Sequence, residues 1–195
     1  MTHNAPLADA LRPKTMDDIV GQAHLFGKNG VLRRMVEAGR MTNMIFFGPP
    51  GTGKTTASRV IASLSGMTFH KLNATTASLS DVKDVLRETG NMFSEKGVLL
   101  YIDEIQYFNK KQQQSLLEYI EDGRVTLIAS TTETPYFYIY KALLSRSAVF
   151  EFKPLIPKDV LPVLARGMAF LNEEEGGEKT LSPEAAEVIA ASSGG

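Results

Sequence analysis

The sequence predicts an α/β fold in which a parallel sheet, flanked by helices, carries a phosphate-binding loop. Short apolar segments alternate with amphipathic segments of helix length over most of the chain, as in βαβ units. The apolar run 98–102 is continuous, which is typical of a strand buried on both faces of a parallel sheet. The segment Met44–Phe47 leads directly into residues 48–55, which fit the phosphate-loop pattern G-x-x-x-x-G-K-[ST].

The elements before and around this loop follow from periodicity and stop signals. Residues 1–10 show no periodicity, and we expect a flexible or loosely docked arm there. A helical pattern begins at Val31, with Gly39 as its stop. A second helix follows the loop over Lys54–Ser65 and ends at Gly66, which can adopt the left-handed conformation that closes a helix.

The remaining elements continue the alternation. Ser80 is the expected N-cap of a helix that runs to about Phe93, and Asn109 is the expected N-cap of a helix that runs to Glu121. A short helix is predicted over residues 142–145. The predicted strands are Met44–Phe47 and residues 68–72, 98–102, 125–130 and 148–152.

The pattern changes after Lys153. Residues 157–171 and 182–191 are expected to be helical, and Pro162 is expected either to kink the first of these helices or to confine it to its later part. Two helices without strands form an incomplete bundle. We therefore expect a truncated helical lid over residues 154–195, after an α/β domain over residues 26–153 and an N-terminal segment over residues 1–25.

Composition excludes several classes of protein. The 195 residues, 43% of them hydrophobic, suffice for one good core and part of a second. A net charge of -1 provides no global basic field, so any contact with nucleic acid needs a local patch. The absence of cysteine excludes disulfides and thiolate metal sites. No segment resembles a secretory signal or a membrane span, so we expect a cytoplasmic protein without a membrane partner.

The glycine-rich run predicts a site for a nucleoside triphosphate. Its glycines let backbone N–H groups converge on phosphate, and the following helix adds its positive end. Lys54 supplies a charge for the outer phosphates, and Thr55 is placed to offer its hydroxyl to Mg²⁺. A glycine-rich turn that matches by accident is the alternative. The expected nucleotide contacts in the loop are Pro50, Gly51, Thr52, Gly53, Lys54, Thr55 and Thr56.

An acidic pair follows the buried run 98–102. Acidic residues at the carboxyl end of a parallel strand point into the crevice where α/β sheets bind ligands. Asp103 could hold Mg²⁺ or its waters, and Glu104 could polarise the water that attacks the terminal phosphate. Two surface acids that simply end a strand are the alternative.

Two further positions are candidates on weaker grounds. The pair Thr131-Thr132 follows another predicted strand, so a hydroxyl there could contact the γ-phosphate or the attacking water. Arg146 follows a short predicted helix and could reach the γ-phosphate of a neighbouring subunit, as arginine fingers do. Turn-forming threonines and a surface arginine in a salt bridge are the alternatives.

These motifs together resemble Walker A, Walker B, sensor 1 and the arginine-finger motif of AAA+ ATPases of the clamp-loader clade. More narrowly, the chain resembles the replication-associated recombination protein A family, which is related to the Werner-helicase-interacting protein. The likeness runs nearly end to end. Outside the Walker motifs it is carried by residues 6–8, 11–13, 17–25, 37–40, 108–110, 112–113 and 131–135.

The resemblance implies roles for individual residues. Residues 1–25 would form an N-terminal arm and adenine-contacting segment, in which Ile19 and Val20 line the adenine pocket. Glu104 would be the catalytic base. Thr132 stands at the sensor 1 position, and Arg146 looks like the finger that acts on a neighbour. Ser130 is a small departure, because relatives more often carry alanine before the threonines.

The resemblance also implies partners and a missing part. The family acts on DNA, here expected to be single-stranded, gapped or forked, and forms a homo-oligomer, a tetramer at full length. Contacts with the replisome or with single-strand-binding protein are implied too, with a location at the nucleoid. The sensor 2 cluster of the lid would lie beyond Gly195. We therefore expect this fragment to bind ATP weakly and to hydrolyse it poorly.

Three functions fit the sequence to different degrees. The first is the ATP-hydrolysing module of a DNA-dependent protein in replication-fork maintenance, recombination and repair. The second is a clamp-loader-like assembly subunit that uses ATP as a partner-binding switch, against which the presence of Glu104 speaks. The third, a small-molecule kinase, would need a substrate-binding insertion that the sequence lacks and would leave Arg146 without a role.

Overall fold

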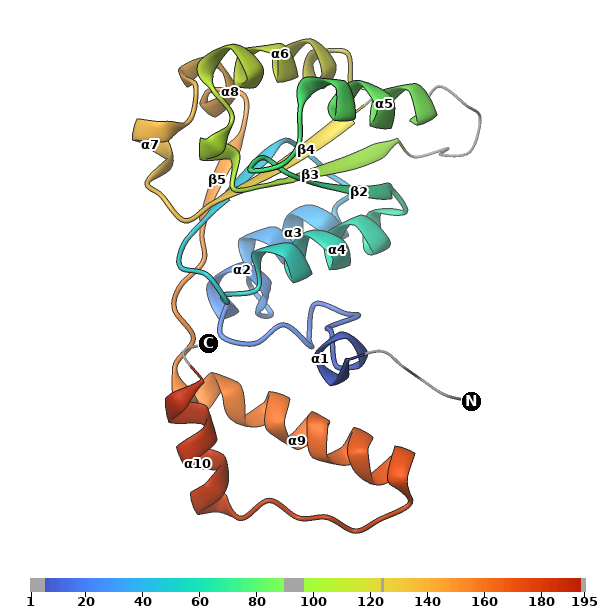
Figure 1. Ribbon diagram of the computed structural model, residues 1–195, viewed down its shortest axis with the longest axis vertical. Helices are drawn as coiled ribbons and strands as arrows, with labels where there is room; N and C mark the ends of the chain where they lie inside the picture. Colours follow the sequence, from blue (N-terminus) through green and yellow to red (C-terminus); the bar gives the residue numbers. More distant parts are fainter. Residues whose placement is uncertain (1–5, 90–96, 124, 194–195) are drawn as a thin grey trace.

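A five-stranded parallel sheet forms the centre of the molecule, as predicted. The computed structural model describes residues 6–89, 97–123 and 125–193. The strand order is β2-β3-β4-β1-β5, and every pair of neighbours is parallel (Figure 1). The strands are β1 Met44–Phe47, β2 Thr68–Asn73, β3 Val98–Asp103, β4 Val125–Thr131 and β5 Ala148–Glu151. Their ends agree with the predicted ends to within one residue.

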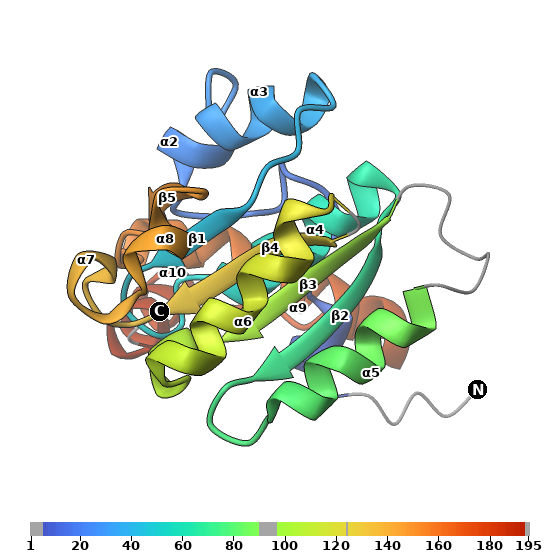
Figure 2. The same ribbon diagram turned by 90° about the horizontal axis from the view of Figure 1, so that it is seen from above.

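Helices cover both faces of this sheet. The helices are α1 Leu7–Ala10, α2 Ala23–Phe26, α3 Val31–Glu37, α4 Lys54–Ser65, α5 Leu79–Thr89, η1 Ile105–Tyr107, α6 Lys110–Glu121, α7 Pro135–Tyr138, α8 Lys141–Leu144, α9 Pro157–Glu175 and α10 Pro183–Ser192. Figure 2 shows α5 and α6 lying across one face, and Figure 1 shows α3 and α4 beneath the other. Helices α9 and α10 pack against each other, away from the sheet (Figure 1).

The core has two halves because successive strand residues point to opposite faces. Met44 and Phe46 belong to the cluster on the α3 and α4 side, while Ile45 belongs to the cluster under α6. Leu99 and Leu100 divide in the same way on β3. Burial on both faces explains why β1, and β3 as far as Ile102, are apolar and do not alternate with polar residues.

The two predicted helix caps have different outcomes. Asn109 is the N-cap of α6, and its side chain accepts a hydrogen bond from the Gln112 backbone N–H at 2.9 Å. The Ser80 prediction is wrong, because Ser80 lies inside α5 and Ser78 precedes the helix. The Ser78 backbone N–H donates to the Asp81 carboxylate at 2.6 Å, which is the reciprocal hydrogen bond of a capping box. This bond joins residues three apart, so Ser80, which is next to Asp81, could not form it. The predicted end at Phe93 lies outside the described residues.

Pro162 does not confine α9 to its later part, as one form of the prediction required. The helix begins at Pro157 and runs through Pro162 to Glu175. The hydrogen bond that a proline ring forfeits would join its nitrogen to the carbonyl four residues earlier, at Lys158. That carbonyl belongs to the first turn of α9, so the loss falls near a helix end.

The N-terminal segment is more ordered than periodicity predicts over its described part. Residues 7–10 form the helical turn α1, and the side chain of Leu11 lies against α9. A methyl group on Gly167 of α9 would come within 3.3 Å of the Leu11 Cδ1 atom. A turn this short carries too little sequence to show a helical period, so periodicity alone predicts a loosely docked arm.

Candidate functional site

The glycine-rich loop connects β1 to α4 in a conformation that few residues other than glycine adopt. Gly51 and Gly53 have φ values of 78° and 93°, in the region that side chains disfavour. Gly48 has a φ of 144°, and a Cβ atom there would lie 2.1 Å from the Phe152 carbonyl oxygen. The loop therefore needs glycine for its backbone conformation and for its close approach to the segment after β5.

Lys54 opens α4 with its ammonium group folded back over the loop. The side chain donates to the carbonyl oxygens of Gly48 and Pro49, each at 2.7 Å, and the residue is only 8% exposed. Burial lowers the pKa of Lys54, and the negative charges of Glu104 and Asp103 oppose that shift. A buried cation held by two carbonyls can exchange these weak partners for an anion.

A buried tyrosine links the loop to the acidic strand end. The Tyr101 hydroxyl oxygen lies 3.0 Å from Thr55 Oγ1, 2.7 Å from Ser130 Oγ and 3.1 Å from Asp103 Oδ1. Ser130 also donates to Asp103 Oδ1 at 2.7 Å. Burial raises the pKa of Tyr101, so the phenol keeps its proton. The network holds Thr55 and Asp103 in a fixed relation to each other.

Asp103 lies at the end of β3 and is held in its charged form. Burial alone would raise its pKa, but bonds from Ser130, Lys71 and Tyr101 and the charge of Lys71 together lower it below the usual value. The Lys71 ammonium lies 3.0 Å from Asp103 Oδ2. The Thr55 hydroxyl and the Asp103 carboxylate are oxygen donors of the kind that Mg²⁺ prefers.

Glu104 has a left-handed backbone conformation. Among the described residues other than glycine it alone has a positive φ, 54°, with a ψ of 49°. Side chains enter this region at a steric cost, and such outliers cluster at functional sites. Gln106 donates to Glu104 Oε2 at 2.5 Å, and Thr132 Oγ1 lies 3.4 Å from the same oxygen. The structure thus brings Thr132 and Glu104 together.

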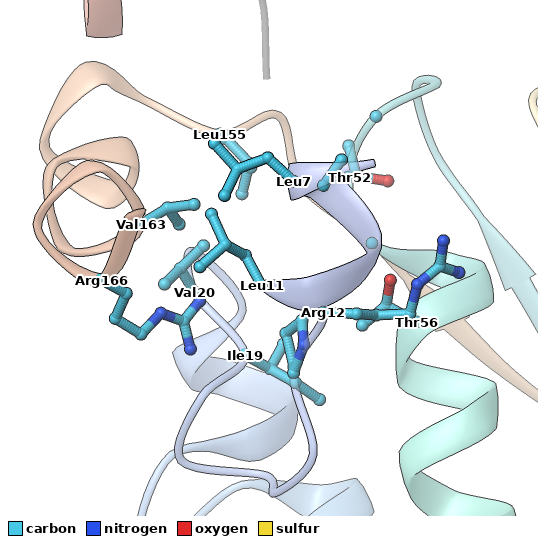
Figure 3. Close-up of a pocket in the computed structure, with 14 residues that line it drawn as sticks. Leu7, Leu11, Arg12, Ile19, Val20, Thr52, Thr56, Leu155, Val163 and Arg166 are labelled. Atoms are coloured by element: carbon cyan, nitrogen blue, oxygen red, sulfur yellow. The ribbon is translucent and has the colours of Figure 1, made fainter. Parts of the chain in front are cut away.

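Two adjoining cavities share the glycine-rich loop. The polar one, about 330 Å³, is lined by residues 50–56 of the loop with Tyr101, Asp103 and Glu104. The other, about 490 Å³, is mainly apolar and includes Ile19 and Val20 (Figure 3). Gly51, Thr52, Gly53 and Thr56 line both. A ligand with an apolar end and a multiply charged end could span the two.

The apolar cavity is assembled from segments far apart in the chain. Figure 3 shows Leu11, Val20 and Val163 directed toward one another, with Thr52 and Thr56 on the opposite side. Sequence reasoning singled out only Ile19 and Val20 among its lining residues outside the loop. It missed Leu7, Ala8, Leu11, Arg12, Pro13, Leu155, Val163 and Arg166. Residues 6–8 and 11–13 carry part of the family resemblance, but nothing in the local sequence places any of these side chains in a cavity, and only their approach in space does so.

Arg146 lies apart from both cavities. Its Nε atom contacts the Glu121 carboxylate at 2.7 Å, and its guanidinium donates to the Ala142 carbonyl at 3.1 Å. Its side chain is 46% exposed, and it is not among the described residues that line either cavity. Of the predicted site residues outside the loop, the structure places Ile19 and Val20 in the apolar cavity and Asp103 and Glu104 in the polar one. Thr132 lines neither cavity but contacts Glu104, whereas Arg146 lies on the surface.

Gln22 connects the loop to the start of the helical segment. It is 1% exposed, and its amide donates to the Lys153 carbonyl at 2.8 Å and to the Thr52 carbonyl at 3.4 Å. The Lys153 N–H donates back to its side-chain oxygen at 3.0 Å. Next to it, Gly21 has a φ of 71°, and a Cβ there would lie 2.2 Å from Leu155 Cδ2. The glutamine therefore fixes the exit from β5 against the loop.

Replacing Gln22 with Ala is expected to lower the free energy of unfolding by about 1–3 kcal/mol, because buried backbone groups lose their partners. Urea unfolding followed by circular dichroism measures the change in midpoint. Gln114→Ala, which removes an exposed amide from α6, is the matched control and should change stability by less than about 0.5 kcal/mol. Equal effects of the two variants would contradict the role of Gln22.

The described residues lack two further features, a cluster of metal-binding side chains and a membrane-spanning helix. They contain no cluster of three or more His, Asp or Glu side chains that could hold a metal ion. Mg²⁺ does not require such a cluster, since it usually keeps several waters and binds through few protein oxygens. No helix in the described part of the chain is long and apolar enough to cross a membrane.

Comparisons with known proteins agree with the geometry. The model of the ATPase family associated with various cellular activities (AAA) matches residues 44–155. The replication-associated recombination protein A of Coxiella burnetii is 41% identical over 177 residues, and that of Escherichia coli K12 is 37% identical over 180 residues. The alignments cover 90% and 92% of this chain but only 40% of each relative. The resemblance expected from the sequence is thereby confirmed.

A solved structure shows the same architecture. The Thermotoga maritima RuvB Holliday junction branch migration motor superposes with a TM-score of 0.72 at 26% identity. The match covers 92% of this chain and 59% of that one. The chain thus spans two fifths of the length of the curated relatives it matches and somewhat more of the motor.

Proposed function

The chain belongs to the AAA family of ATPases, and on that premise we propose that it is the ATP-binding and ATP-hydrolysing module of a DNA-dependent protein in replication-fork maintenance, recombination and repair. The relatives named above support the biological setting. We assign residues 26–153 to the ATPase domain, residues 154–195 to part of a helical lid, and residues 1–25 to the segment that contacts adenine. The protein would act in the cytoplasm at the nucleoid.

The observation that carries the proposal is the pair of cavities joined at the glycine-rich loop. ATP has one apolar, flat end and one end with several negative charges. The apolar cavity, with Ile19 and Val20, suits the adenine, and the polar cavity, with Lys54 and Thr55, suits the phosphates. The loop residues between the two would bind the phosphates through their backbone N–H groups.

The residues of the polar cavity suggest how hydrolysis proceeds. Glu104 would accept a hydrogen bond from a water and orient it for in-line attack on the γ-phosphorus, as the bond to the leaving ADP oxygen breaks. Thr132, within reach of Glu104, would help to hold that water or the γ-phosphate. Lys54 would leave the Gly48 and Pro49 carbonyls and pair with the phosphate oxygens, where charge develops in the transition state.

The donor set fits a magnesium ion. Thr55 and Asp103 would hold it, since an oxygen atom of each already contacts the Tyr101 hydroxyl. When bound with the nucleotide, Mg²⁺ neutralises phosphate charge. Tyr101 and Ser130 would keep the two oxygens in place before the ion arrives, which reduces the reorganisation that binding requires.

We propose that Arg146 exchanges its surface ion pair with Glu121 for the site of a neighbouring subunit. Its exposed position outside the chain's own cavities is compatible with such a role. We propose that the protein works as a homo-oligomer, a tetramer when complete, on single-stranded, gapped or forked DNA. Contacts with the replisome or single-strand-binding protein fit the same role.

Steady-state ATPase measurements on the complete protein test this function. We expect single-stranded or gapped DNA to raise ATP turnover without any partner protein, and duplex DNA to raise it less. Lys54→Ala should remove the activity in every condition, because the phosphates lose their main cation. If DNA did not change the ATP turnover and only a protein partner raised it, the result would instead support an assembly subunit that uses ATP as a switch.

A further inference from the structure

A second surface feature lies between the start of α6 and the turn α7. A groove of about 450 Å³ is lined there by the consecutive aromatic residues Tyr136, Phe137 and Tyr138 and by the lysines Lys110 and Lys141. The three aromatic residues are 64%, 84% and 51% exposed. Clusters of exposed aromatic side chains are uncommon on a protein surface and mark sites of interaction.

The exposure of these rings is built into the fold. Pro135 is buried at the start of α7, and Ile139 after it is 4% exposed. Gln113 of α6, itself 3% exposed, donates to the Tyr138 carbonyl at 3.2 Å and accepts from the Tyr140 N–H at 2.8 Å. These anchors fix the backbone on both sides of the turn, and so the rings between them are held outward.

The groove is also basic, although the chain as a whole is not. The net charge is -1, yet no carboxylate is found among the described residues that line the groove, which include Lys110 and Lys141. The Lys110 ammonium lies 5.5 Å from the centroid of the Tyr140 ring. Flat apolar rings beside ammonium groups complement a ligand that has flat bases and a negative backbone.

We propose that this groove binds single-stranded nucleic acid, with bases stacked on the rings of α7 and the backbone phosphates near Lys110 and Lys141. Stacking platforms flanked by basic side chains are the general means of binding single strands without sequence preference. A duplex keeps its bases paired and stacked, so it cannot use the rings. The inference rests on the proposed function for the class of partner, and it assigns the surface that this function leaves open.

The groove is connected to the ATPase site through both of its walls. One wall begins with Phe108, which follows Glu104 through the short helix η1. The other wall is α7, which begins shortly after Thr132, the residue that follows the end of β4. Glu104 and Thr132 lie within 3.4 Å of each other. Single-stranded nucleic acid in the groove would therefore contact the two segments that lead to Glu104 and Thr132, the residues proposed to position the attacking water.

The test measures binding without nucleotide, so that its outcome does not depend on ATP hydrolysis. Fluorescence anisotropy would follow the 195-residue chain with labelled oligo-dT and oligo-U of about 15 nucleotides, within the range that single-strand sites cover. Both should bind, and duplex of the same length should bind more weakly. Equal affinity for duplex and single strand would overturn the stacking geometry.

Phe137→Ala should weaken binding of either oligonucleotide about 5-fold or more, because one stacked base loses its platform. Phe137→Tyr should restore affinity, since it keeps the ring. Val188→Ala on α10 removes an apolar side chain that is 67% exposed and should change nothing. Unchanged affinity in Phe137→Ala would overturn the proposal.

The lysines have a separate readout in the salt dependence. Lys110→Gln and Lys141→Gln should each reduce the slope of log K against log salt by about 0.7, the value for one phosphate of a single strand. Lys28→Gln, in the turn between α2 and α3, is the matched control and should leave the slope unchanged. If the slope of log K against log salt were the same in all three variants, Lys110 and Lys141 would not contact the phosphates.

Two outcomes separate this proposal from others. A change in sedimentation of Phe137→Ala with unaltered oligonucleotide affinity would mean that the groove binds a second copy of the chain, and the proposal would be wrong. Loss of single-strand binding in Phe137→Ala, in a protein whose ATP turnover ignores DNA, would support the groove while contradicting the proposed function.

Discussion

Arg146→Ala is expected to lower the ATP turnover of the assembled protein by about 10³-fold or more, with ATP affinity near that of the unaltered protein. The reason is the placement of the guanidinium, which is paired with Glu121 at the surface and lies outside the cavities of its own chain. Removing it leaves the ATP-binding residues intact but takes away positive charge from a neighbour's transition state. Turnover and nucleotide titration, measured on the same preparation, separate the two effects.

Mixed assemblies show whether the arginine acts between subunits. Subunits with Arg146→Ala keep Glu104, while subunits with Glu104→Gln keep Arg146. If the arginine acts on a neighbour, mixing the two inactive proteins should restore part of the turnover, because some interfaces combine an intact base with an intact finger. No recovery in an assembled mixture would contradict the shared site. Arg87→Ala, which breaks a surface pair with Asp84 on α5, is the control for loss of an exposed arginine.

Glu104→Gln is expected to reduce turnover by about 10²–10⁴-fold, the usual contribution of a general base. The amide has the shape of the carboxylate but cannot accept the proton of the attacking water. ATP binding should persist, because in the proposed site the loop residues, and not Glu104, hold the phosphates. A rapid-quench measurement of the hydrolysis step distinguishes slow chemistry from slow product release.

The control for that variant is Glu118→Gln, which neutralises an exposed carboxylate on α6. It should leave turnover unchanged, since Glu118 lines neither cavity. If Glu104→Gln retained the turnover of the unaltered protein, Glu104 would be a structural acid and its left-handed backbone would need another explanation.

Local sequence was sufficient wherever neighbouring residues supply the physical cause. The loop could be predicted because β1, the glycines and α4 are contiguous, and Gly51 and Gly53 serve a backbone need of that same turn. The Asn109 cap could be predicted because its partner, Gln112, lies three residues away. Asp103 and Glu104 could be predicted because a parallel strand ends beside the ligand crevice.

Other features had a partial signal in the sequence. Ser130 stood out as a departure from the resembling family, but nothing local indicated that it bonds Tyr101 and Asp103. The aromatic run 136–138 was visible in the sequence, and only burial of its flanks shows that the rings face solvent. In both cases the sequence shows the residue type, and only the structure shows what surrounds it.

The sequence by itself determined the phosphate loop, the acidic strand end and the alternation of strands and helices, because these depend on contacts between near neighbours in the chain. Only the tertiary structure decided the strand order, the apolar cavity beside the loop and the separation of Arg146 from its own cavities. Leu11, Val20 and Val163 meet there because burying apolar surface lowers the free energy regardless of distance along the chain. That driving force is non-directional, so it leaves no spacing in the sequence from which such a cavity could be predicted.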